Sequence, residues 1–292
     1  MEKTSGKQRS EPRAIYSERA SQRAVVNRVS MKHSSGYLRS HGWLLLRIAR
    51  SEIASRFAGS LLGAGWAVVT PVLMLLIYAV VYLLVLRVQV QGMTSAGYVV
   101  LIFTGLVPFL MTSEALNNGV SSVVANRAVL ANTVFPIDLV PVKAVVLAQV
   151  TMITGLVVVL VAAAFLGDLK ATALLLPIIW LLHVLFLVGL LWLLSLINIV
   201  FRDLQNFVGV VLMLLMIASP IAYTPEMVPN GLKLIITLNP IAYYIIAYQD
   251  IIVFGKMPSV QLWISLILMS SVTFVGGGYF FVRAKRSLID YV

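Results

Sequence analysis

Few residues of this chain could carry chemistry, and most of them fall on one predicted helix. Glu114 is the only acid well inside an apolar segment, and hydroxyl and amide side chains surround it in two rows with i,i+4 spacing. The rows are Ser113, Asn117 and Ser121, and Glu114, Asn118 and Ser122. Because residues four apart share one face of a helix, this pattern predicts a polar face. Such a face lines a transport path or a subunit contact, or it is a structural hub of hydrogen bonds.

The motifs of several enzyme classes are absent from the sequence. It contains no G-x-x-x-x-G-K-[ST] loop for nucleotide phosphates, no H-E-x-x-H zinc helix and no G-x-S-x-G nucleophile turn. Cysteine is absent, which excludes thiolate ligands, and the three histidines are scattered. His183 stands alone on an apolar helix, which favours a packing role over a proton relay. We therefore predict that the chain is not an enzyme and binds no metal or cofactor itself.

The composition is that of a membrane protein. The chain has 292 residues, of which 60% are hydrophobic and 11% charged, with a mean hydropathy of +0.96; soluble domains have about 25% charged residues. The net charge is +11, but 12 of the 22 Lys and Arg lie at or before Arg56. A basic tail beside an anionic leaflet explains this excess, so no nucleic-acid partner is predicted. We expect residues 1–40 to be a disordered tail. This tail is expected to stay in the cytosol, because it lacks the apolar run of a signal peptide.

Six segments are apolar and long enough to span a bilayer, which requires about 20 residues. The expected spans are 66–86, 98–124, 139–166, 174–200, 204–223 and 262–282. Arg202 and Asp203 interrupt a long apolar run, and a charged pair is costly at the bilayer centre. They therefore predict a tight turn between the fourth and fifth spans. The expected fold is an all-α integral membrane domain over 41–292.

The distribution of positive charge sets the expected orientation. Short loops rich in Lys and Arg stay on the cytosolic side. With the tail inside, 18 of the 22 Lys and Arg are cytosolic. Both termini are therefore expected in the cytosol.

Three further segments are not expected to span. Residues 41–57 place Trp43 and Ile53 on one apolar stripe, as in a helix that lies in the membrane interface. Residues 125–141 are a cytosolic loop in which Pro136 ends a short helix. Residues 224–259 are two short apolar pieces flanking Asn239 and Pro240, which predicts a re-entrant outer pair of helices. A plain extracellular loop is the alternative for the last segment.

Two further groups of side chains could contact a substrate. Tyrosines and a phenylalanine near span ends either form an interfacial belt or stack on sugar rings, because aromatic faces suit the apolar side of a pyranose. These candidates are Tyr78, Tyr82, Phe109, Tyr223, Tyr243 and Tyr244. At the inner interface, Arg47, Arg50 and Arg56 could bind an anionic lipid head group, or they could be ordinary positive-inside anchors.

Five motifs, in this order, resemble the membrane subunit of bacterial ABC-2 type polysaccharide exporters, the permeases for O-antigen, capsule and teichoic acid. They are SRFAGSLLGAGWAVVTPVLMLLIYAVVY (55–82), FPIDLVPVK (135–143), NIVFRDL (198–204), SPIAYTPEMVP (219–229) and NPIAYYIIAYQDIIVFG (239–255). The resemblance implies a homodimer of six-span subunits that encloses a channel for a lipid-linked polysaccharide. It also implies two copies of a separate ATPase, which would bind ATP and Mg²⁺, and a location in the bacterial inner membrane.

The resemblance also implies roles for the segments that do not span. The loop 126–138 would be a coupling helix that docks in the ATPase, the 202–203 turn would be a second contact, and the helix 41–57 would be a gate near the lipid head group. The re-entrant pair would shape the outer exit. The docking residues implied in this way are Asn126, Arg127, Phe135, Asp138, Arg202 and Asp203.

Two other functions stay open. One is a permease of the same type that exports a lipid or a drug-like compound. The other is a membrane-embedded glycan polymerase or ligase, which normally carries catalytic acids or arginines in long outer loops. Here the outer loop offers only Glu226, Lys233, Asp250 and Lys256.

Overall fold

The computed structural model describes residues 47, 50–52, 59–85, 93–127, 136–167 and 169–288. The chain divides into two units, Met1–Ile48 and Ala49–Val292. Arg47 is the described residue of the first unit, and it is helical and exposed. The predicted tail, most of the predicted interfacial helix 41–57, and Arg56 and Phe135 lie outside the described residues. The remaining description concerns the second unit.

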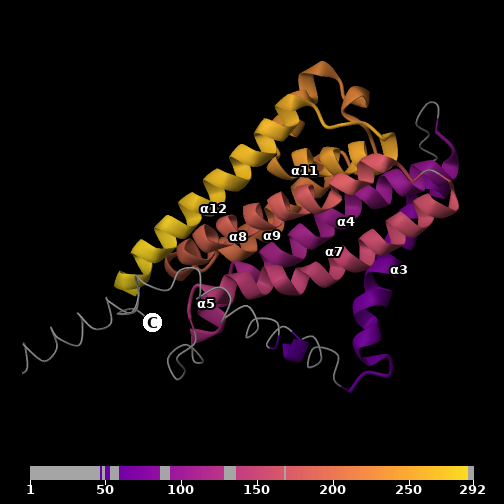
Figure 1. Ribbon diagram of the computed structural model, residues 1–292. Coiled ribbons are helices and arrows are strands. Elements are labelled where there is room, and N and C mark those ends of the chain that lie inside the picture. The colour runs from indigo at the N-terminus through magenta and orange to yellow at the C-terminus, as the bar shows by residue number, and fades with distance from the viewer. Residues whose placement is uncertain are drawn as a thin grey trace, which may run out of the picture. The chain divides into compact units, whose positions relative to one another are not determined.

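The described elements are all helical (Figure 1). The helix α3 (Trp66–Val80) continues into a π-helical turn, Val81–Val85, and α11 (Pro240–Gln249) continues into a second, Asp250–Phe254. The other helices are α4 (Ser95–Gly119), α5 (Ser122–Ala125), α7 (Leu139–Phe165), α8 (Leu176–Val200), α9 (Leu204–Ala218), α10 (Lys233–Leu238) and α12 (Val260–Leu288). Single 3₁₀ turns occupy Gly63–Gly65, Ala171–Leu175, Pro225–Met227 and Asn230–Leu232.

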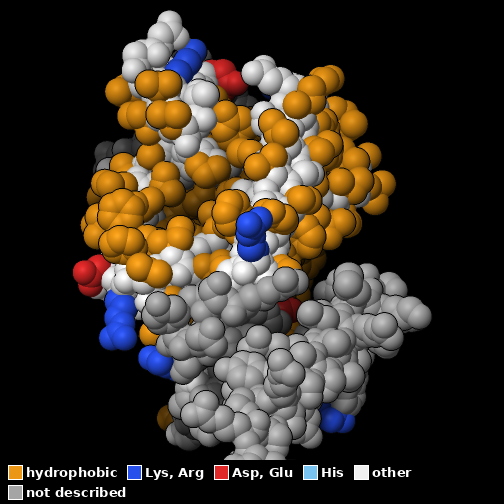
Figure 2. Space-filling view, turned by 90° about the vertical axis from the view of Figure 1, so that its left-hand side faces the viewer, with side chains coloured by type: hydrophobic (Ala, Val, Ile, Leu, Met, Phe, Trp, Pro, Cys, Tyr) orange, Lys and Arg blue, Asp and Glu red, His pale blue; other side chains and the backbone are white. Residues whose placement is uncertain are grey.

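The long helices form a bundle of a multi-pass membrane protein. In the described part of the chain, four helical segments are long and apolar enough to cross a membrane: Ser95–Gly119, Leu139–Phe165, Ala171–Val200 and Val260–Ala284. The pair Asn230–Leu238 and Pro240–Phe254, bent by 99°, could count as a fifth span. Hydrophobic side chains cover most of the described surface on the face shown in Figure 2. This surface suits contact with lipid.

The fifth predicted span is shorter than expected. α9 ends at Ala218 rather than near residue 223, and Ser219 is already extended with φ −85° and ψ 142°. Pro220 explains the end of the helix, because a proline disfavours helical geometry in the residue before it. With 15 residues, α9 falls below the length of a full span, and so does the α-helical part of α3.

The turn between α8 and α9 is as predicted. α8 ends at Val200, α9 begins at Leu204, and the exposed residues Arg202 and Asp203 lie between them. The predicted break in the segment 224–259 is also present. It falls at Asn239, whose side-chain oxygen accepts hydrogen bonds from the backbone N–H groups of Ile241 (3.0 Å) and Ala242 (3.4 Å). This cap starts α11 in a new direction.

The seam between α8 and α12 is unusually close. A Cβ atom added to Gly189 would lie 2.2 Å from the carbonyl carbon and oxygen of Thr273, and one added to Gly277 would lie 2.2 Å from the oxygen of Gly189. Ser270 donates a hydrogen bond to the carbonyl of Leu182 across the same seam, at 2.8 Å. Small residues that allow two backbones to approach are the usual basis of helix packing in membranes.

His183 packs in the core, in agreement with its predicted structural role. Its side chain is fully buried, its Nε2 lies 2.9 Å from Oγ1 of Thr112, and its ring stacks on Tyr244 with 4.3 Å between centroids. The hydroxyl of Tyr244 in turn forms a 2.8 Å hydrogen bond with Oγ of Ser270. These contacts join α4, α8, α11 and α12.

Candidate functional site

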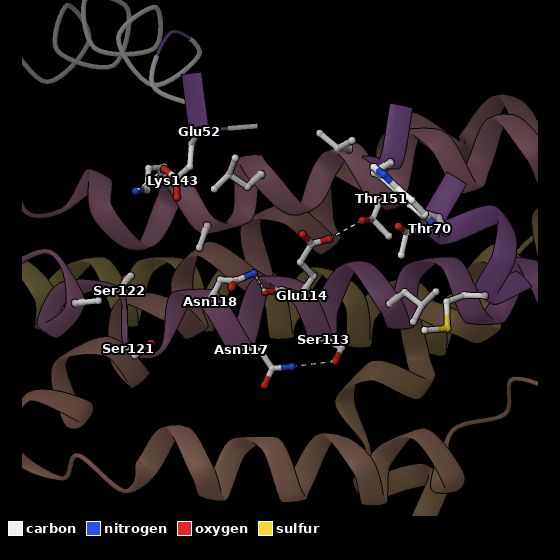
Figure 3. Close-up of a pocket in the computed structure, with 18 of the residues that line it drawn as sticks. Glu52, Thr70, Ser113, Glu114, Asn117, Asn118, Ser121, Ser122, Lys143 and Thr151 are labelled. Carbon is white, nitrogen blue, oxygen red and sulfur yellow. Dashed lines mark hydrogen bonds and ion pairs between the residues drawn. The ribbon is translucent and has the colours of Figure 1, made fainter. Parts of the chain in front are cut away.

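Ser113, Glu114, Asn117 and Asn118 form the predicted polar face on α4, but the helix ends at Gly119 rather than near residue 124, so Ser121 lies in the following turn and Ser122 begins α5. Glu114 and Asn117 point in different directions (Figure 3). Glu114 points toward α7, where Thr151 donates a 2.5 Å hydrogen bond from Oγ1 to Oε2 of Glu114. Asn117 points away from α7 and donates a 3.3 Å bond to Oγ of Ser113. On that side lies α9, because a Cβ on Gly209 would lie 3.9 Å from Oδ1 of Asn117.

Both rows line a cavity of about 860 Å³ between α3, α4, α5 and α7. This volume lies in the range of ligand pockets, about 300–1,000 Å³. The polar residues of its lining are Glu52, Thr70, Ser113, Glu114, Asn117, Asn118, Ser121, Ser122, Asn126, Lys143 and Thr151. Trp66, Pro71, Met74 and Leu110 are among its apolar residues. The six residues predicted from the sequence as one polar face thus share one cavity.

An ion pair lies at one end of the cavity. Nζ of Lys143 on α7 is 2.8 Å from Oε2 of Glu52, with 14% of the Lys143 side chain and 42% of the Glu52 side chain exposed. In Figure 3 this pair lies at the end near Ser122, and Thr70 and Thr151 lie toward the other end. The pair connects the segment before α3 to α7.

The sequence reasoning missed the contribution of α7 to this site. In the sequence Lys143 stands out only as one of the cytosolic positive charges, and Thr151 is an isolated hydroxyl residue in an apolar span. Lys143, Leu147 and Thr151 follow each other at four-residue spacing and all line the cavity. The same i,i+4 pattern that revealed the face of α4 therefore gives a weak signal on α7 as well.

The described residues of the predicted ATPase-docking surface gather at one end of the bundle. α5 packs against α7 and α8, and Asn126 and Arg127 directly follow it. The Nε1 of Trp192 on α8 donates a 3.0 Å hydrogen bond to the carbonyl of Asp138, which precedes α7. The Arg202–Asp203 turn follows α8 at this same end (Figure 1).

Three of the predicted aromatic residues form a group where α3 meets the C-terminal part of α9. The rings of Tyr78 and Tyr82 stack with 6.3 Å between centroids, and the Tyr78 hydroxyl lies 3.4 Å from Sδ of Met216. The Tyr223 hydroxyl donates a 3.5 Å hydrogen bond to the carbonyl of Ile217, near the C-terminal end of α9. These three tyrosines are partly exposed, so their rings can be reached from outside the protomer.

The other three predicted aromatics are not in this group. Phe109 and Tyr244 are buried in the core of the bundle, with exposures of 2% and 0%. Neither ring therefore has an open face on which a substrate could stack. Tyr243 is partly exposed and donates a 3.0 Å hydrogen bond to the carbonyl of Thr237. Among the predicted head-group arginines, Arg47 and Arg50 are both helical and exposed.

Comparison with known proteins places these features in a wider group. A family model described as ABC-2 type transporter matches residues 44–253. Two proteins of Klebsiella pneumoniae, each named O-antigen export system permease protein RfbA, are similar to the chain. One is 31% identical over 231 residues, 78% of this chain and 86% of the relative. The other is 29% identical over 250 residues, 85% and 93% of the two chains. A Myxococcus xanthus protein of the same name is 27% identical over 252 residues, 85% and 95% of the two chains.

Proposed function

Since the chain belongs to the ABC-2 type transporter family, we propose that it is the membrane subunit of an ATP-driven exporter. Its cargo is a lipid-linked polysaccharide of the O-antigen type, which it moves from the cytosol across the bacterial inner membrane. The observation that carries this proposal is the similarity to relatives named O-antigen export permeases, which extends over 78–85% of the chain. The polar cavity beside α4 supports it, because a hydrophilic cargo needs polar surface inside an apolar bundle.

The energy for export comes from a separate ATPase subunit. The sequence has no phosphate-binding loop of its own, so ATP and Mg²⁺ bind to that partner. Two copies of the ATPase serve a homodimer of this chain. They dock at the end of the bundle that carries Asn126, Arg127, Asp138 and the Arg202–Asp203 turn. Phe135, which lies outside the described residues, is proposed to belong to the same contact.

In this proposal the chain has six spans with both termini in the cytosol. The shorter helices α3 and α9 count as the first and fifth spans, and the bent pair of α10 and α11 dips into the outer side of the membrane. The helix 41–57 lies at the inner interface as a gate. There Arg47, Arg50 and Arg56 attract the anionic head group of the lipid carrier.

Deletion of the gene tests the proposed cargo. We expect the surface of the deletion strain to lose its polysaccharide and the finished glycan to accumulate in the cytoplasm, as measured with glycan-specific antiserum on intact and on lysed cells. A plasmid copy of the wild-type gene should restore the surface signal. A normal surface glycan in a strain without a related permease would contradict the proposal and favour a lipid or drug-like substrate.

A substitution in the α8–α9 turn tests the docking surface. Arg202 is exposed, so Arg202→Ala should leave membrane insertion intact while export falls and less ATPase co-purifies. Lys233→Ala is the matched control, because Lys233 is also an exposed cation but begins α10 in the predicted outer segment. Full export and normal co-purification with Arg202→Ala would remove the turn from the docking surface.

A further inference from the structure

The cavity beside α4 has the side chains of a site for hydroxyl-bearing ligands. Asn117 and Asn118 are exposed on its wall, and each amide both donates and accepts hydrogen bonds. The carboxyl group of Glu114 adds an acceptor, and Ser113, Ser121 and Thr70 add hydroxyl groups that can do either. A ligand with many hydroxyls at short intervals can satisfy such a wall.

The position of the Glu114 carboxyl group is fixed by α7. The 2.5 Å hydrogen bond from Thr151 holds one of its oxygens, and both residues line the cavity. A carboxyl group held in this way presents its acceptor in a defined direction. Thr151 is therefore a positioning residue, and Glu114 is the group that would contact the ligand.

The charges of the lining oppose an anionic ligand. Among the described residues that line the cavity, Lys143 is the one cation, and it already lies 2.8 Å from the carboxylate of Glu52. Glu52 and Glu114 are two acids against this one base. Among these described side chains, a phosphate or a uronic acid would meet two carboxyl groups and one ammonium group, which a carboxylate already contacts. An uncharged ligand meets no such repulsion.

An aromatic ring completes the wall. Trp66, the first residue of α3, lines the cavity and is partly buried. An indole offers an apolar face on which the C–H side of a sugar ring can stack. Hydroxyl-binding groups on α4 and α7 thus face the same space as an aromatic residue on α3.

From this arrangement we propose that the cavity between α3, α4 and α7 is a binding subsite for uncharged sugar rings of the exported glycan. Glu114, Asn117 and Asn118 hydrogen-bond the sugar hydroxyls, and Thr151 positions Glu114. The anionic head group of the carrier stays outside the subsite. This inference rests on the proposed function, because a sugar reaches the cavity only if the cargo is a glycan.

Photocrosslinking in cells tests the contact directly. The crosslinking amino acid p-benzoylphenylalanine is introduced at Asn117, at Asn118, or at Val157 as a control. Val157 is 55% exposed on α7 and is not part of the cavity lining. After irradiation of cells that make the glycan, the tagged protein should shift to a high-mass ladder for positions 117 and 118 but not for position 157. A ladder of equal strength at position 157, or none at 117 and 118, would overturn the subsite.

Mass spectrometry of the crosslinked peptide tests the chemical class. We expect an attached uncharged sugar. A uronic acid, a phosphate-bearing unit or only a phospholipid on the peptide would refute the assignment. Restoration of the surface glycan by the wild-type protein in the same strain separates failure of the subsite from failure of the proposed function. The proposed function then stands even if the subsite fails.

The rate at which new glycan reaches the surface tests the role of Glu114. Glu114→Ala should slow its arrival about three- to tenfold, the range of one hydrogen bond, whereas Glu114→Gln keeps an acceptor and should retain most of the rate. Thr151→Val should slow arrival and Thr151→Ser should restore it. Membrane abundance and ATPase co-purification exclude misfolding. Equal rates for all four variants and the wild type would refute the hydrogen-bonding role.

Discussion

The close seam between α8 and α12 gives a prediction whose size follows from the geometry. A Cβ on Gly189 would lie 2.2 Å from two backbone atoms of Thr273 and 2.4 Å from the backbone nitrogen of Phe274. Non-bonded carbon atoms prefer about 3.5–4.0 Å, so Gly189→Ala must push the helices apart by about 1.3 Å or more. The atoms in the way are backbone and cannot rotate aside. We therefore expect a loss of about 3 kcal/mol, at the upper end of the range for overpacking.

Thermal unfolding of the purified protein in detergent measures this loss. For a chain of this size, about 3 kcal/mol corresponds to a fall of about 6–12 °C in the melting temperature. Gly277→Ala should lower the melting temperature by as much, because its Cβ would lie 2.2 Å from the oxygen of Gly189. Gly119→Ala should lower the melting temperature less. The atom nearest to its Cβ, at 2.5 Å, belongs to the side chain of Leu191, which can change rotamer.

The matched control is the neighbouring glycine on α12. A Cβ on Gly276 would meet no atom within 4 Å, so Gly276→Ala should melt at the wild-type temperature or slightly above it, because alanine favours the helix. The reasoning fails if Gly189→Ala and Gly277→Ala melt together with Gly276→Ala. That result would mean that the two helices do not approach as closely as described.

Three further predictions concern the cap of α11, the tyrosines and the topology. Asn239→Ala should lower the melting temperature by the equivalent of about 1 kcal/mol or more. It removes the α11 cap and the 2.8 Å bond to Ser219, and Asn239→Asp, which keeps the acceptor, should lose less. Tyr82→Ala should slow export of the longest glycan chains on a gel of surface polysaccharide while Tyr82→Phe does not, and equal chain-length profiles would argue against stacking. A single cysteine at Gly167 or Lys256 should react with an impermeant thiol reagent from outside the cell, whereas one at Asn132 or Ser287 should not. Outside labelling of Asn132 would overturn the orientation.

Features that depend on local chemistry could be predicted from the sequence. Arg202 and Asp203 are too polar to remain inside an apolar run, so a turn follows from their cost alone. The rows on α4 are visible because i,i+4 spacing is a property of one helix. The break at Asn239 follows from an amide that caps and a proline that can start a helix but not continue one.

Features that depend on packing between distant segments could not. Phe109 and Tyr244 resemble Tyr78 and Tyr223 in residue type, yet the first two are buried in the core. Around Phe109, residues 101–110 of α4 contain no charged or amide side chain, so no amphipathic stripe there separates an inner from an outer side of the helix. Similarly, the closeness of Gly189 and Gly277 follows from the docking of two helices that are far apart in the chain. Gly277 lies next to Gly276 in a run of three glycines, and nothing in that run indicates which of them meets α8.

If α9 is the fifth span of the proposed topology, its shortness affects the lipid around the protein. Its 15 residues rise roughly 22 Å at about 1.5 Å per residue, whereas the hydrocarbon core of a bilayer is about 30 Å thick. A bilayer answers such hydrophobic mismatch by thinning beside the helix. Phe207, Met213 and Ile217 on α9 are exposed apolar side chains, so in that topology the lipid beside this helix meets a short apolar surface. The bilayer there would be thinner than in the surrounding membrane.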